Sequence, residues 1–134
     1  MTTRALLRAS VATEAAALVF LLVLPTAASA HAGMISSEPG RRAVLSIAPK
    51  QIRLCFNENV EAGFSKVLLE DGAGKAVVLP PPARDGAKTR CLIVPLPALA
   101  NGSYTVKYKV LSVDGHIVEY GYGFRIQAAG AVND

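Results

Sequence analysis

The chain has no tryptophan, and it contains only two histidines, two cysteines and two methionines. So few histidines exclude a His-rich metal site and an active site with several acid–base centres. No nucleophile elbow, acid pair or phosphate-binding glycine loop is present, so hydrolytic chemistry has no support. The two histidines, His31 and His116, are therefore the residues whose positions need an explanation.

Charged residues are also sparse and scattered. They make up 18% of the 134 residues, against 51% apolar residues, which excludes a disordered, highly charged chain. The net charge is +4, but no basic run is longer than Arg41-Arg42. This pattern argues against a nucleic-acid surface, and the length suits one domain.

Residues 1–30 have the pattern of a secretory signal peptide. Two arginines precede an apolar run at residues 15–24, which is too short for a spanning helix of about 20 residues. Ala28-Ser29-Ala30 then provides a cleavage pattern of small residues. The alternative is an uncleaved membrane anchor. We expect cleavage after Ala30 and an exported protein that begins at His31 and lies outside the cytoplasm, with no membrane insertion of the mature chain.

The rest of the chain alternates apolar and polar residues, as β-strands do. In Gln51–Phe56 the apolar residues Ile52, Leu54 and Phe56 share one face. Similar patterns occur at residues 65–70, 75–79, 90–94, 104–110 and 120–126, with a short strand near Met34. About 100 residues in about seven strands predict an all-β, immunoglobulin-like Greek-key sandwich over residues 31–127. We expect residues 80–89 to form a loop and residues 128–134 a flexible tail.

Cys55 and Cys91 both lie in expected strands, on the faces opposite the core residues. An even number of cysteines in an exported chain favours a disulfide. A thiolate metal site or a redox pair is the alternative, although the spacing is not that of a C-x-x-C motif.

His31 would become the first residue of the mature protein. A free N-terminal histidine offers its α-amine and its imidazole Nδ1, which together close a chelate ring on one metal ion. Both groups have reference pKa values near neutrality, so a metal ion can displace their protons. The alternative is a chance histidine at a frayed terminus.

The other histidine belongs to the sequence Ser112-Val113-Asp114-Gly115-His116. In an extended strand, Asp114 and His116 would point to the same side. With His31 they supply three nitrogens and one oxygen, a set that suits tetragonal Cu(II) better than tetrahedral Zn(II). Asp-Gly is also a common turn pair, so a plain turn with a surface histidine stays open. Glu58 is either a second-shell carboxylate that orients a ligand histidine or a solvated loop acid.

Taken together, these residues resemble the CopC family of periplasmic copper-resistance proteins, over residues 31–127. The resemblance rests on His31-Ala32 after the leader, Ser37-Glu38-Pro39, Ala48-Pro49, Arg53-Leu54-Cys55-Phe56-Asn57-Glu58, Val60-Glu61, Leu99-Ala100-Asn101-Gly102-Ser103-Tyr104, Ser112-Val113-Asp114-Gly115-His116 and Gly123-Phe124. It implies an immunoglobulin-like or cupredoxin-like fold without electron transfer. It also implies one tightly bound Cu(II) at His31, Asp114 and His116, with Glu58 close to the site.

The resemblance further implies a role in copper homeostasis and resistance, as a carrier or buffer without enzymatic activity. A CopD-type inner-membrane protein would be the partner, and we expect a monomer. Some relatives have a second, Met-rich site for Cu(I). Here Met34 is the one methionine of the mature chain, and it stands where relatives carry an apolar residue. We therefore expect no Cu(I) site, because Cu(I) needs soft ligands.

Two other functions compete with the copper carrier. Copper held by an N-terminal histidine also occurs in lytic polysaccharide monooxygenases, but oxygen activation needs an open coordination position, which Asp114 would fill. A metal-free envelope interaction domain is the third possibility, since a sandwich fold does not imply a function. It would leave His31 and His116 dispensable.

Overall fold

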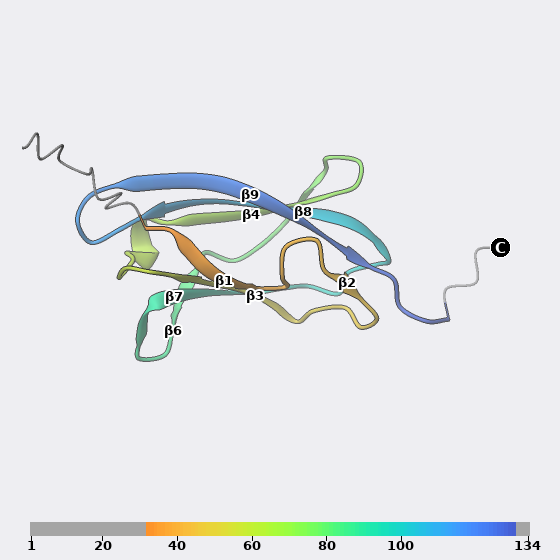
Figure 1. Ribbon diagram of the computed structural model, residues 1–134. Helices are drawn as coiled ribbons and strands as arrows, with labels where there is room; N and C mark the ends of the chain where they lie inside the picture. The colour runs from red at the N-terminus through yellow and green to blue at the C-terminus, as the bar shows by residue number, and fades with distance from the viewer. Residues whose placement is uncertain (1–31, 131–134) are drawn as a thin grey trace, which may run out of the picture.

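The computed structural model describes residues 32–130, which form two β-sheets packed face to face (Figure 1). One sheet has four strands in the order β1-β3-β7-β6, and the other has five in the order β2-β9-β8-β4-β5. The elements are β1 (Met34–Glu38), β2 (Val44–Leu45), β3 (Gln51–Phe56), the 3₁₀ helix η1 (Ala62–Phe64), β4 (Lys66–Asp71), β5 (Ala76–Val77), β6 (Ala83–Asp85), β7 (Lys88–Pro95), β8 (Gly102–Leu111) and β9 (Ile117–Ile126). No helix among the described residues is long and apolar enough to cross a membrane.

The core lies between the sheets and comes from the alternation seen in the sequence. In β8, four alternate residues are buried, and the lysines between them face solvent. Fully buried Ile52, Leu54 and Phe56 of β3 face them from the other sheet. The Phe56 ring meets Tyr108 edge-on at 5.7 Å between centroids. The predicted all-β sandwich is therefore the observed fold.

Two short strands lie outside the predicted set. The two residues of β2 pair in parallel with the end of β9, and the three residues of β6 pair with β7 inside the expected loop of residues 80–89. Segments of two or three residues are too short to show a period, so only their partners reveal them. Ala128, the first residue of the expected tail, is bound to the sandwich, because its amide donates to Asn101 Oδ1 at 3.0 Å.

β8 and β9 form a long antiparallel hairpin, paired from Gly102↔Ile126 to Leu111↔Ile117. Gly121 lets the two backbones pack closely, because a Cβ there would make a tight contact of 3.1 Å with the carbonyl oxygen of Val106. The predicted inward alternation of β9 fails at Tyr120, whose side chain is 57% exposed. Instead, its ring packs under the Arg41 guanidinium, which lies 5.1 Å from the ring centroid.

Cys55 and Cys91 are joined in a disulfide, so neither supplies a thiolate. They lie directly opposite each other on β3 and β7. Both are almost fully buried although they point away from the core.

Candidate metal centre

Asp114 and His116 come together in the turn that connects β8 to β9. The turn is closed by the Ser112 amide, which donates to the carbonyl oxygen of His116 at 2.9 Å. Gly115 has a φ of +89°, a conformation that residues with a side chain rarely adopt. The sequence argument for the pair assumed an extended strand, and that assumption was wrong. The chain reverses direction at Gly115, and the two side chains meet because the turn folds them together.

The carboxylate of Asp114 binds its neighbours on both oxygens. Its Oδ2 lies 2.9 Å from His116 Nδ1. Its Oδ1 accepts the hydroxyl hydrogen of Ser112 and the amide hydrogen of His116, the latter at 3.2 Å. Ser112 is 1% exposed, so its hydroxyl is a fixed donor, whereas the side chains of Asp114 and His116 are 35% and 47% exposed. The pair is thus hydrogen-bonded to buried Ser112 on one side and exposed to solvent on the other.

These contacts favour the ionised form of Asp114 over the protonated form. The hydrogen bond from Ser112, with smaller contributions from His116, lowers the pKa of Asp114 to about 2. A carboxylate with this pKa carries its full negative charge at neutral pH, so a metal ion does not have to displace a proton from it.

We expect Ser112→Ala to raise the pKa of Asp114 toward its ordinary value of 3.8, because the largest cause of the shift is removed. The titration of the Asp114 carboxyl carbon, followed by NMR in metal-free protein, measures this. Ser65→Ala is the matched control: Ser65 is also buried, but its hydroxyl donates to the backbone oxygen of Glu61 and accepts the amide of Leu111, without contacting Asp114. An unchanged Asp114 pKa in Ser112→Ala would show that Ser112 does not control the carboxylate.

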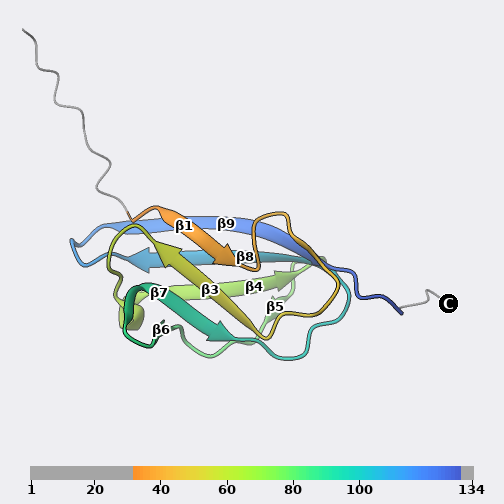
Figure 2. The ribbon, with the colours of Figure 1, turned by 60° about the horizontal axis from the view of Figure 1, so that its bottom comes forward.

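The start of the described chain is anchored at the same end of the molecule as this turn (Figures 1 and 2). Ala32 is fully buried in the core. The amide of Gly33 donates to Asn57 Oδ1 at 2.8 Å, and the Asn57 amide donates to the Gly33 oxygen at 2.9 Å. His31, which directly precedes Ala32 in the sequence, lies outside the described residues.

The other predicted site residue, Glu58, does not join the pair. Within residues 32–130, no three His, Cys, Asp or Glu side chains form a group that could hold a metal ion. Glu58 is half-buried in the segment after β3. That Glu58 orients a ligand histidine stays a prediction.

Sequence reasoning missed Ser112 and Asn57. The Ser-x-Asp spacing is a signal for Ser112, since a serine two residues before an aspartate can hydrogen-bond to it within a turn. Asn57 had no local signal, because its partner Gly33 is 24 residues away in the sequence.

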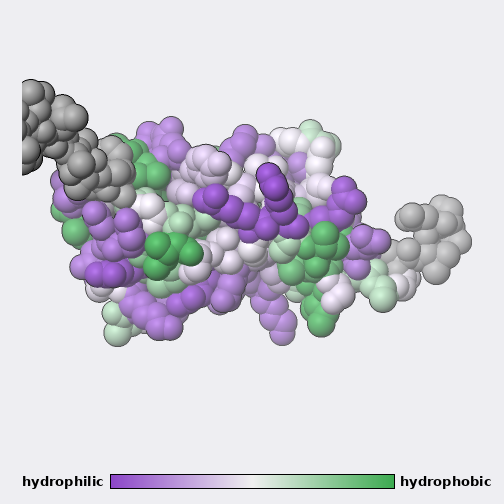
Figure 3. Space-filling view, in the orientation of Figure 1, coloured by the Kyte–Doolittle hydropathy of each residue, from purple (hydrophilic) through white to green (hydrophobic). Residues whose placement is uncertain are grey.

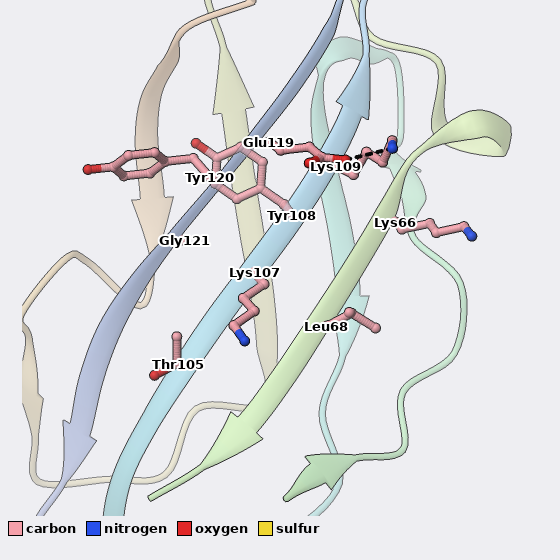
Figure 4. A pocket seen from close by; sticks show the side chains of 9 residues that line it. All are labelled: Lys66, Leu68, Thr105, Lys107, Tyr108, Lys109, Glu119, Tyr120 and Gly121. Atoms are coloured by element: carbon pink, nitrogen blue, oxygen red, sulfur yellow. Dashed lines mark ion pairs between the residues drawn. The ribbon is translucent and has the colours of Figure 1, made fainter. Parts of the chain in front are cut away.

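A shallow pocket of about 660 Å³ lies elsewhere, on the solvent-facing side of β4, β8 and β9 (Figure 4). Neither Asp114 nor His116 lines it, and its Lys109 is paired with Glu119 at 2.6 Å. The face shown in Figure 3 is mostly hydrophilic, with separate apolar groups. The turn between β8 and β9 is therefore the strongest candidate for a functional site in the described chain.

Comparison with known proteins agrees with this fold. A family model described as the CopC domain matches residues 34–127. Protein YobA of Escherichia coli K12 is 36% identical over 99 residues, which cover 73% of this chain and 80% of YobA.

Two crystal structures are similar over almost their whole length. CopC from Methylosinus trichosporium OB3b has a TM-score of 0.72 and 35% identity, covering 76% of this chain and 99% of its own. PcoC from Escherichia coli, described as a methionine-rich copper resistance protein, has a TM-score of 0.64 and 27% identity, covering 73% and 100%. Both share the two-sheet fold described above.

Proposed function

Because the chain belongs to the CopC family, we propose that it is a periplasmic copper-binding protein that carries or buffers one Cu(II) per chain. The single observation that carries the proposal is the Asp114–His116 pair, held together at 2.9 Å in an exposed turn. Copper is the cargo here, and the similarity to PcoC, a copper resistance protein, supports its choice.

The donor set fits Cu(II). We propose that His31 supplies its α-amine and imidazole after cleavage of the leader, that His116 supplies a second imidazole, and that Asp114 supplies a carboxylate oxygen. Three nitrogens and one oxygen match the preference of Cu(II) for tetragonal N and O ligands, and Cu(II) has the highest affinity of the common divalent metals. The ionised state of Asp114 adds a negative charge next to the ion.

A site for Cu(I) is not part of the proposal. Cu(I) selects thioether and thiolate ligands. Met34 is packed against the core, and both cysteines are in the disulfide. This chain therefore differs from its methionine-rich relative PcoC in the ligands that it can offer.

We propose a carrier rather than an oxygenase because Asp114 would complete the coordination plane, which leaves no in-plane position for oxygen. The partial exposure of Asp114 and His116 suits a cargo that must be handed to another protein. A CopD-type membrane protein is the partner that we propose, with a monomeric chain as donor. The disulfide supports export, because such bonds persist in oxidising compartments such as the periplasm.

The test is a Cu(II) titration of protein purified from the periplasm, with its mass and EPR spectrum recorded. We expect a mass that begins at His31, one Cu(II) per chain and a tetragonal signal with three nitrogen ligands. A correctly cleaved chain that binds no Cu(II) tightly would overturn the proposal. Zn(II) in place of Cu(II) is the control, and we expect it to bind more weakly.

A further inference from the structure

The disulfide lies where β3 ends. Cys55↔Cys91 is the last register pair of β3 and β7, and Cys55 is followed by Phe56, the final residue of β3. Arg53 covers it from outside: its Nη2 lies 3.6 Å from Cys91 Sγ, and its Nε is paired with Asp85 at 2.7 Å. A cross-link at this position acts on the segment that leaves the sheet, residues 57–61, which we call the connecting segment.

The connecting segment is bound to the start of the described chain through Asn57. Asn57 exchanges two hydrogen bonds with Gly33, one through its side chain and one through its backbone. Asn57 is two residues from Cys55 in the sequence. The cysteine on β3 therefore lies close, along the chain, to the anchor of the N-terminal segment.

Next, the connecting segment is bound to β7 through Thr89. The hydroxyl of Thr89 donates to Asn59 Oδ1 at 2.7 Å, and the backbone oxygen of Thr89 accepts the Val60 amide at 3.0 Å. Thr89 is two residues from Cys91. The connecting segment is therefore attached to both strands that the disulfide joins. It follows β3 directly, and it is hydrogen-bonded to β7 at Thr89, two residues from Cys91.

On its other side, the connecting segment holds the turn with Asp114 and His116. The backbone oxygen of Asn59 accepts the Val113 amide at 3.1 Å, and Val60 forms an isolated bridge with Ser112. The Glu61 amide donates to the backbone oxygen of Leu111 at 2.8 Å. One five-residue segment therefore contacts both the N-terminal segment and the turn.

From this arrangement we propose that the Cys55–Cys91 disulfide, by fixing the connecting segment, positions the turn with Asp114 and His116 relative to the N-terminal segment at Gly33. The proposal rests on the proposed function. A site built from donors far apart in the sequence binds tightly only when its supporting contacts hold the donors in place. Loss of the disulfide should thus loosen the site in a protein that is still folded.

The main test compares Cu(II) affinity in wild type, Cys55→Ala/Cys91→Ala and the control Val94→Ala, all in folded protein with the native N-terminus. Val94 is buried on β7 and pairs with Ile52 toward the other end of the same two strands, so its truncation weakens the core without touching the connecting segment. We expect the cysteine variant to bind about 10–100-fold more weakly, as for loss of outer-shell support, and Val94→Ala to bind as wild type does.

Hydrogen exchange in metal-free protein gives a readout that does not depend on copper. In the cysteine variant we expect faster exchange at the amides of Gly33 and Val113, beyond any change in global stability; in Val94→Ala these amides should follow global stability alone. A folded cysteine variant with wild-type affinity and wild-type exchange at both amides would overturn the inference.

A second pair of variants decides the question if the cysteine variant does not fold. Thr89→Val removes the hydroxyl that binds Asn59 and keeps the side-chain shape, whereas Thr89→Ser keeps the hydroxyl. We expect Thr89→Val to bind Cu(II) several-fold more weakly and Thr89→Ser to bind normally. Equal affinities would overturn the role of the connecting segment. If wild type itself binds no Cu(II), the proposed function fails, and the exchange data still report on the coupling.

Discussion

A protein with one extra residue before His31 should bind Cu(II) about 100-fold more weakly, or worse, than a protein that begins at His31. The extra residue converts the α-amine into an amide, which at neutral pH is not a ready donor. One of the four proposed donors is lost. The chelate ring that joins the α-amine and the imidazole of His31 on one ion is lost with it. Linking two contacts in this way typically contributes a factor of about 10²–10⁴ to affinity.

The measurement is a competition titration against a Cu(II) chelator, with both proteins verified by intact mass. The matched control carries the same extra residue after Asp134, at the other end of the chain, and should bind as the native protein does. The EPR spectrum of the extended protein should also lose one nitrogen ligand. Equal affinity with and without the N-terminal extension would eliminate His31 as a chelating ligand.

This prediction depends on how the described chain begins. Ala32 is buried, and Gly33 makes two hydrogen bonds with Asn57. A segment fixed so close to the expected cleavage site has little freedom to move. An added residue therefore acts on the donor chemistry of His31 and leaves the sandwich unchanged, so far-UV circular dichroism should not differ between the proteins.

The sequence predicted the long strands well, because their residues carry a clear period of two. β3 was expected at the residues that form it, Gln51–Phe56, and the alternation in β8 predicted the correct core face. β2 and β6 were not predicted, because strands of two or three residues are too short to show a period and are defined by their pairing with β9 and β7. Tyr120 escaped because the packing of Arg41 over its ring comes from a distant loop.

The candidate site was only partly readable from the sequence. Asp114 and His116 were singled out by residue type and spacing. The extended conformation assumed for the pair was wrong, and the Asp-Gly turn kept as the alternative is the conformation that forms, with Gly115 at a φ of +89°. The support beneath them was not readable. Asn59 and Thr89 are 30 residues apart in the sequence, and no local pattern at either residue predicts their hydrogen bond. The types of the possible metal ligands can be read from the sequence. Their positions in space also depend on contacts between residues that are far apart in the chain.

The second large effect is expected for His116→Ala, which should weaken Cu(II) binding by more than the roughly 10–100-fold typical of outer-shell changes. An imidazole nitrogen is a strong ligand for Cu(II), and its loss cannot be replaced by water at equal affinity. Ile117→Ala is the matched control. Ile117 directly follows His116 in the sequence, is also exposed, and has no metal-binding atom in its side chain. Competition titration and the number of nitrogen couplings in the EPR spectrum provide the measurement.

Asp114 should matter less than His116, and two variants separate its contributions. Asp114→Ala loses the charge, the metal-binding oxygen and the contact with His116 Nδ1, whereas Asp114→Asn keeps an oxygen acceptor for Ser112 and His116 without the charge. If Asp114→Asn retains most of the affinity, the residue acts chiefly by orienting His116. If both variants bind as weakly as His116→Ala, the carboxylate is a principal ligand, and the ranking proposed here is wrong. The order of the three affinities therefore tells which atoms of this turn contact the ion.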